Sequence, residues 1–188
     1  LEGMILMNHG VFSFGDSAKQ SYDRMIGIVN KAEKFLKGNQ VFRKYKKSNA
    51  KIDLLTLAKI RKKASDLAGK PCLAILNDSS EAIGFSKMKI AEDLSVRGPL
   101  TPDHVIRTKP FAWILDSDLE KSAIRFKNNY NKYFKKYKSQ NHTKLNNGPK
   151  WALWINYGIF VLGFQKKKHK LLMILTGIQL ELCKHHLC

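Results

Sequence analysis

One ten-residue pattern occurs twice in this chain and constrains its fold more than any other feature. Residues 6–15 align with residues 154–163, and both end on the pattern Asn-[His/Tyr]-Gly-[Val/Ile]-Phe-x-[Phe/Leu]-Gly. Asn and Gly tolerate a positive φ, so each copy predicts two short strands joined by a turn. A basic amphipathic segment follows each copy. The sequence therefore predicts two hairpin-then-helix units, of which only the first carries a histidine, His9.

Helical and extended patterns alternate along the rest of the chain. Helices are predicted at 17–36, opened by a Ser17-to-Gln20 capping box and stopped by Gly38, at 52–67, after Thr101, at 118–137 and from 165 onward. Strands are predicted at 72–76 (buried), 83–85 (an edge), 111–115, 150–155 and 159–162. This order predicts an α/β fold in α/β/α layers, with helices flanking an incomplete, mainly antiparallel sheet.

The net charge of +19 raises the question of a nucleic-acid or anionic-surface partner. Only six of the 34 basic residues are Arg, the residue that most often reads bases. The lysines are spread along the chain. In the densest stretch, residues 127–138, the aromatic residues fall at the spacing of an ordinary amphipathic helix. We therefore expect solvated lysine-rich faces and no specific nucleic-acid partner.

The cysteine pattern and the hydropathy indicate the cellular compartment in which this protein is expected. Cys72, Cys183 and Cys188 are odd in number and irregularly spaced, which favours neither a disulfide framework nor a cysteine-based zinc site. We expect a reducing, cytoplasmic setting. No run of eighteen apolar residues occurs, so no membrane span is expected. His185 and His186 lie between the last two cysteines, where a frayed terminus is favoured over a soft-metal site.

The first hairpin carries a family resemblance. The string from Ile5 to Gly15, continued through Asp23-Arg24-Met25, resembles the metal-site hairpin of the class II (metal-dependent) aldolase/adducin family. In that family the His before Gly is one of three zinc ligands, so the resemblance implies that His9 binds zinc. The family's other two ligands form a His-x-His pair, and a Glu serves as acid/base. This sequence contains no His-x-His, and the Glu is absent too.

Two further strings extend the resemblance to nearly all of residues 1–165. Residues 97–109, Arg-Gly-Pro-Leu-Thr-Pro-Asp-His-Val-Ile-Arg-Thr-Lys, resemble an insertion in long members of the family, including those fused to a short-chain dehydrogenase. Residues 149–163 resemble the region that closes the aldolase part of those members. The implied divisions are the end of an aldolase/adducin core at 1–38, a helical connection at 39–70, a second α/β segment at 71–165 and a divergent basic tail at 166–188.

The resemblance implies a function for the intact protein. A zinc-dependent aldolase, expected to form a homo-oligomer, would cleave a ketose 1-phosphate to dihydroxyacetone phosphate and an aldehyde. This chain would be a fragment that is inactive alone, with an unpaired apolar edge at 4–14 and 150–162. His104, Arg107 and Lys109, beside Asp103, would contact substrate, or else form a capped structural helix with solvated charges. Two alternatives remain: an adducin-like interaction module without metal, and a basic nucleic-acid binder.

Overall fold

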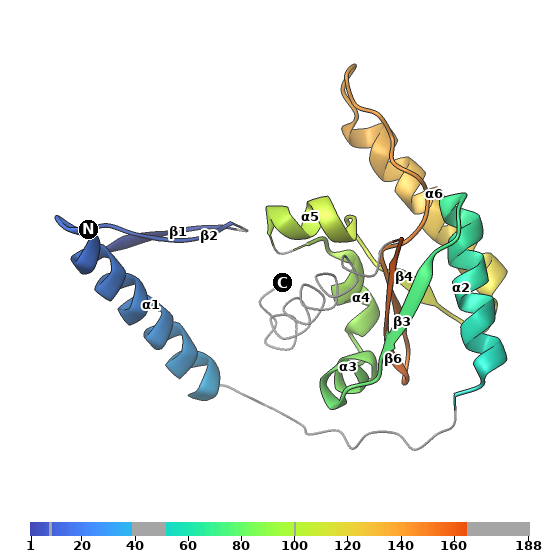
Figure 1. The fold of residues 1–188 in the computed structure, drawn as a ribbon, viewed down its shortest axis with the longest axis horizontal. Coiled ribbons are helices and arrows are strands. Elements are labelled where there is room, and N and C mark those ends of the chain that lie inside the picture. Colours follow the sequence, from blue (N-terminus) through green and yellow to red (C-terminus); the bar gives the residue numbers. More distant parts are fainter. Residues whose placement is uncertain (8, 39–51, 100, 165–188) are drawn as a thin grey trace.

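The computed structural model describes residues 1–7, 9–38, 52–99 and 101–164 (Figure 1). Its strands are β1 (Gly3–Leu6), β2 (Gly10–Ser13), β3 (Leu73–Asn77), β4 (Trp113–Leu115), β5 (Trp151–Trp154) and β6 (Gly158–Gly163). Its helices are α1 (Ala18–Gly38), α2 (Leu54–Ala68), α3 (Ser80–Ser86), α4 (Ala91–Val96), α5 (Pro102–Thr108) and α6 (Leu119–Tyr137). Helices and strands alternate, so the α/β prediction is confirmed.

A four-stranded sheet in the order β3-β6-β5-β4 organises residues 52–164. β6 pairs antiparallel with both β3 and β5, whereas β4 pairs parallel with β5. The described sheet is open and mixed, and mainly antiparallel as expected. Both edges are short strands: β3 on one side and β4 on the other.

Side chains alternate between the two faces of this sheet, and helices cover each face. One cluster joins α2 and α6 to the sheet, and its buried members include Ile60, Ala64, Trp113, Phe126, Ala152, Phe160 and Leu162. The other joins α3 and α4 to the opposite face, and includes Phe85, Leu94, Trp151, Leu153 and Ile159. Residues 152 and 153 thus point into different cores, as the period of a strand requires. The result is the α/β/α layering predicted from sequence.

The helix boundaries follow local capping signals. Asp53 accepts hydrogen bonds from the amides of Leu55 and Thr56 at 3.1 and 3.0 Å, and α2 ends at Gly69, whose φ is 70°. At the start of α1 the Ser17 hydroxyl accepts from the amide of Gln20 at 3.2 Å. The Gln20 side chain, however, accepts from Asp16 rather than Ser17, so the predicted capping box is only half formed.

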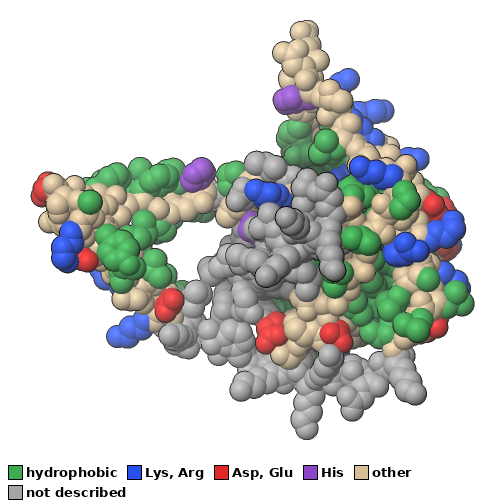
Figure 2. All heavy atoms as spheres, viewed as in Figure 1, with side chains coloured by type: hydrophobic (Ala, Val, Ile, Leu, Met, Phe, Trp, Pro, Cys, Tyr) green, Lys and Arg blue, Asp and Glu red, His purple; other side chains and the backbone are tan. Residues whose placement is uncertain are grey.

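The strands β1 and β2 form a separate two-stranded hairpin against which α1 packs. Figure 2 shows hydrophobic side chains along this hairpin and helix. Many remain well exposed, among them Met4, Ile5, Met7, Phe12, Tyr22, Ile26, Val29 and Phe35. The predicted apolar surface at residues 4–14 is therefore present.

Three predictions about strands were wrong. Residues 72–76 do not form a buried strand, because β3 is an edge strand that leaves Leu73 and Ile75 exposed. Residues 83–85 lie within helix α3, which Ser79 caps by accepting from the amide of Ala82 at 3.2 Å. Residues 150–162 form no apolar edge, since β5 and β6 are the inner strands. The helix predicted from residue 165 lies outside the described residues.

Candidate functional site

The histidine singled out from the first hairpin lies in its turn. The amide of His9 donates to the carbonyl of Leu6 at 3.1 Å, and the exposed imidazole stacks on Phe12 with ring centroids 6.0 Å apart. Within the described ranges no group of three or more His, Cys, Asp or Glu side chains could hold a metal ion. A catalytic zinc needs about three protein ligands. The donor set that the structure describes around His9 therefore does not fit zinc by itself.

The 97–109 motif forms the end of α4, a turn and helix α5. Thr101 has the extended conformation of an N-cap, with φ −138° and ψ 161°, and Pro102 follows at the first helical turn, as the sequence predicts. The Thr101 hydroxyl does not cap a helix amide. It pairs instead with Nδ1 of His104 at 2.8 Å. His104 is only 3% exposed, so this side chain holds the start of α5 in place.

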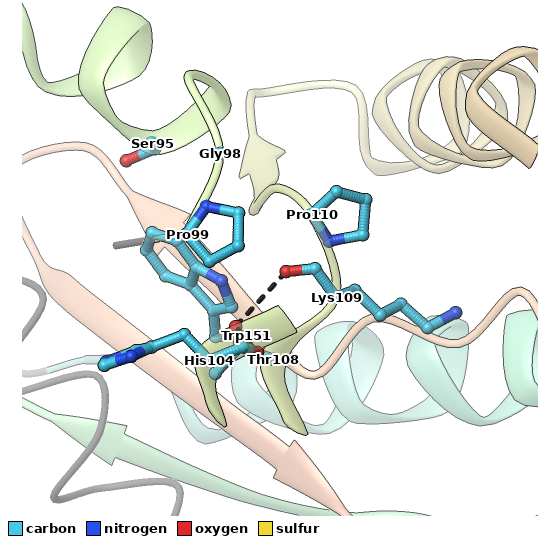
Figure 3. Close-up of a pocket in the computed structure, with 8 residues that line it drawn as sticks. All are labelled: Ser95, Gly98, Pro99, His104, Thr108, Lys109, Pro110 and Trp151. Atoms are coloured by element: carbon cyan, nitrogen blue, oxygen red, sulfur yellow. Dashed lines mark hydrogen bonds between the residues drawn. The ribbon is translucent and has the colours of Figure 1, made fainter. Parts of the chain in front are cut away.

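The end of the motif is a sharp change in backbone direction. The Thr108 hydroxyl donates to the carbonyl of His104 at 2.6 Å and closes the last turn of α5. Lys109 then adopts a φ of 67° and a ψ of 171°, a conformation that residues with a Cβ rarely adopt and that costs about 1 to 3 kcal/mol. In Figure 3 the side chains of His104 and Lys109 extend in opposite directions. The two residues therefore do not converge on one point.

A small cavity lies between these residues and the sheet. It has an accessible volume of about 10 Å³ and is lined by Ser95, Gly98, Pro99, His104, Thr108, Lys109, Pro110 and Trp151 (Figure 3). The buried Ser95 hydroxyl has no hydrogen-bond partner in the part of the chain that the structure describes. A space of this size holds about one water molecule. The cavity thus fits a single bridging water rather than a substrate.

Lys109 is the most perturbed titratable group of the described residues. It is 5% exposed, its ammonium donates to the carbonyl of Asn146, and it lies 3.8 Å from the ring centroid of Tyr130. The pKa of Lys109 is lowered from 10.5 to about 7, mainly by burial and to a smaller extent by the nearby positive charges of Lys150 and Lys144. Near neutral pH this amine is therefore close to half charged.

The remaining candidate, Arg107, is exposed on the last turn of α5. The structure thus presents Arg107 to solvent, buries His104 against Thr101 and directs Lys109 toward the loop after α6. Sequence reasoning missed the partners of Lys109, which are Tyr130, Lys144, Asn146 and Lys150. Residue spacing gave no signal for them, because three of the four lie in the 139–150 segment, which lacks regular structure.

Comparison with known proteins finds a protein-family model that matches the part of the chain containing the four-stranded sheet. The family model described as "Aldolase class II, second domain" matches residues 51–176, more than half of the chain. The chain belongs to this class II aldolase family. The match includes α2 through β6, and so contains the four-stranded sheet, both helical layers and the 97–109 motif. No curated protein and no solved structure matches the chain.

This membership confirms the class II aldolase resemblance read from the sequence and supports an aldolase-type function at the level of the family. The matched residues begin after α1, so the hairpin with His9 lies outside them. Among the described helices none is long and apolar enough to cross a membrane.

Proposed function

We propose that this chain contributes the second domain of a metal-dependent class II aldolase that acts on a ketose 1-phosphate. The reaction would break the C3–C4 bond of the sugar and release dihydroxyacetone phosphate and an aldehyde. The family match over residues 51–176 carries this proposal, because it contains the sheet, its helical layers and the 97–109 motif in one unit. Assembly as a homo-oligomer in the cytoplasm is part of the same proposal.

The N-terminal hairpin has a separate role in this proposal. We propose that His9 is one ligand of a zinc site that is completed by residues this sequence does not contain, since it has no His-x-His. The exposed position of the imidazole at the hairpin turn supports that role, because a partner can reach it. The described residues supply too few donors to hold zinc alone. The chain by itself is therefore proposed to be inactive.

Within the 97–109 motif the proposed roles differ from residue to residue. Arg107 is exposed and carries a permanent charge, which suits direct contact with an anionic substrate. His104 is buried and paired with Thr101, so we assign it the role of a positioning residue for α5. Lys109 offers an ammonium on the other side of the backbone from His104 (Figure 3).

Metal content and sugar-phosphate cleavage together test the proposal. The purified chain is expected to hold far less than one zinc per molecule and to release no dihydroxyacetone phosphate. Mixed with a polypeptide that carries the family's His-x-His and acid/base Glu, it is expected to gain both properties. His9→Ala should abolish the gain, and Arg107→Ala should weaken cleavage with zinc retained. Stoichiometric zinc and cleavage by the chain alone would contradict the shared site.

An adducin-like role without metal is the second candidate, favoured by the lack of a metal-holding group in the described ranges. It predicts that the mixture binds as a complex but gains neither zinc nor cleavage. The same two measurements therefore separate the candidates.

A further inference from the structure

A groove lies along the outer face of helix α2, at the outside of the molecule (Figure 1). It has a volume of about 710 Å³ and extends from Leu55, in the first turn of α2, to Pro71, beyond its last turn. Residues three or four apart share one face of a helix, so the helical residues of the groove lie opposite the buried Ile60, Ala64 and Ala68. The core therefore uses one face of α2 and leaves the other to solvent.

Small and apolar residues form the floor of this groove. Ala58, Ser65 and Gly69 fill little space and leave room between the longer side chains around them. Leu55, which is 60% exposed, and the exposed Pro71 present apolar surface at the two ends. From Leu55 to Gly69 the helix rises by about 20 Å, which equals about four turns of a second helix. The groove is therefore long enough to hold an amphipathic helix by its apolar face, a common mode of peptide recognition.

The rim of the groove is basic. Its cations are Lys59, Arg61, Lys62 and Lys70, and the described lining residues include one carboxylate, that of Asp66. Asp66 pairs with Lys62 at 3.3 Å, but the two side chains are 49% and 77% exposed, and a pair so open to solvent contributes little. Positive charge therefore remains along the groove and favours a negatively charged ligand.

Neither a second copy of the chain nor its other segments supply that negative charge. A second copy carries a net charge of +19. Residues 39–51 contain five Lys or Arg residues and no Asp or Glu, and residues 165–188 contain five Lys and one Glu. Like charges that are brought together oppose binding. Charge complementarity therefore indicates a separate, acidic partner.

A nucleic acid is also acidic, but it matches the groove less well than a protein segment does. Single-stranded nucleic acids bind by stacking their bases on aromatic side chains, and the described lining residues include no aromatic one. The carboxylate of Asp66 repels phosphate groups. The apolar surface of Leu55 and Pro71 calls instead for apolar side chains in the ligand.

We infer that the α2 groove binds an acidic amphipathic helix of a partner protein. The apolar residues of that helix, at helical spacing, lie against Leu55, Ala58 and Pro71, and its Asp and Glu residues face the basic rim. None of the residues to which zinc or substrate is assigned lines this groove. The inference is therefore independent of the proposed function.

Fluorescence anisotropy with the full chain and labelled synthetic helices of about 14 residues tests the inference. The first peptide has Leu at helical spacing and Glu elsewhere, the second has Gln in place of Glu, and the third has Ser in place of Leu. At about 0.15 M salt, which screens long-range attraction to the chain, the first peptide is expected to bind at least about tenfold more tightly than the other two. That result requires both the apolar floor and the basic rim.

Two groove variants and two matched controls locate the binding. Leu55→Asn should weaken binding of the first peptide about tenfold, because it removes apolar surface from the groove. Lys59→Gln should weaken it about threefold, as expected for an ion pair in solvent. Ile124→Asn and Lys127→Gln make the same kinds of change at exposed positions of α6, outside the groove, and should bind as the parent does. Thermal melts verify that every variant folds.

Four results would overturn the inference. If the groove variants and the control variants lose affinity alike, the net charge of the chain explains the binding. If the peptide with Ser binds as tightly as the first, the floor is not used. Tighter binding of a DNA oligonucleotide, weakened by Lys59→Gln and not by Lys127→Gln, would assign the groove to nucleic acid. Loss of self-association in Leu55→Asn, measured by sedimentation, would assign it to a second copy.

Discussion

His9 and Tyr157 occupy the same position in two hairpins that are far apart in the sequence. The amide of His9 donates to the carbonyl of Leu6 at 3.1 Å, and the amide of Tyr157 donates to that of Trp154 at 3.0 Å. The registers also agree, since Leu6 pairs with Gly10 as Trp154 pairs with Gly158. The repeated sequence pattern thus encodes one turn and one register twice.

The two hairpins differ in what surrounds them. β5 and β6 lie inside the four-stranded sheet, whereas β1 and β2 pair with no other strand of the described residues. Position 156 has a φ of 69°, which the third residue of a type II turn requires and Asn tolerates. The repeated residues fix the hydrogen-bonded turn in both copies. Whether a copy is buried depends on the strands that pair with it.

The first prediction uses the matched glycines of the two hairpins. A Cβ on Gly158, whose φ is 122°, would lie 2.3 Å from the carbonyl oxygen of Asn77 in β3, whereas a Cβ on Gly10 would meet nothing within 4 Å. Gly158→Ala should therefore lower the free energy of unfolding by roughly 3 kcal/mol or more, and Gly10→Ala, where a φ of 159° adds backbone strain but no clash, by only about 1 kcal/mol. Urea denaturation measures both. Equal losses would show that β3 does not restrict the second turn.

The second prediction concerns the pairing of Thr101 with His104. Thr101→Val keeps the shape of the side chain but removes the hydroxyl that pairs with the buried imidazole at 2.8 Å. An unpaired buried polar atom costs about 1 to 3 kcal/mol, so the variant should be less stable by that amount. Thr101→Ser restores the hydroxyl and should recover most of the loss. A Val variant as stable as the parent would mean that other contacts of His104 suffice.

The sequence predicted those parts of the fold that are determined by residues close to one another along the chain. The helices α2 and α6 were predicted from the apolar spacing within their own segments, and in the structure Asp53 and Asp118 cap them through amides within three residues. Helix α3 was mistaken for a strand because Ala82, Ile83 and Phe85 form a short apolar run without a usable period. All of that run is buried, so tertiary packing rather than periodicity decides its conformation.

The candidate site shows the same difference between features with a local cause and features that depend on residues far apart in the sequence. Thr101 at the N-cap and Pro102 after it were predicted, since these are properties of neighbouring residues. The neighbours of Lys109 were not, because Lys109 follows α5, whereas Tyr130 lies in α6 and Lys144 and Asn146 come after it. These residues meet around Lys109 through contacts between positions far apart in the sequence. The sequence presents the same residues as unremarkable members of a lysine-rich composition.

The third prediction follows from the exposed apolar surface of the N-terminal hairpin and helix. Ile5 is 71% and Tyr22 is 65% exposed, and such surfaces associate when repulsion allows it. The net charge of +19 opposes association at low salt, and salt screens it over about 8 Å at physiological strength. Light scattering should therefore show larger species at about 0.5 M salt than at about 0.05 M.

The matched variants for association are Tyr22→Lys, which adds charge on the apolar surface, and Lys127→Gln, which removes a charge elsewhere. The lysine variant should stay monomeric at salt concentrations where the parent associates. If the parent remains a monomer that melts cooperatively at high salt, the exposed surface does not drive association.

The last prediction is a pH dependence of stability due to Lys109. Its pKa is about 7 in the folded chain and 10.5 when unperturbed, so between these values the unfolded chain binds more protons. The free energy of unfolding should therefore rise with pH in this window, by up to about 1.4 kcal/mol per unit from this residue. Below about pH 7 both states carry the proton, and this contribution levels off at its least favourable value.

Lys109→Met removes the titrating group and keeps an apolar stem of similar length. Denaturant unfolding from about pH 6 to about pH 9 should give a smaller rise for the variant than for the parent. The variant should also be the more stable of the two at pH 6, because it buries no charge there. Parallel pH profiles for the two proteins would show that Lys109 is hydrated and titrates normally.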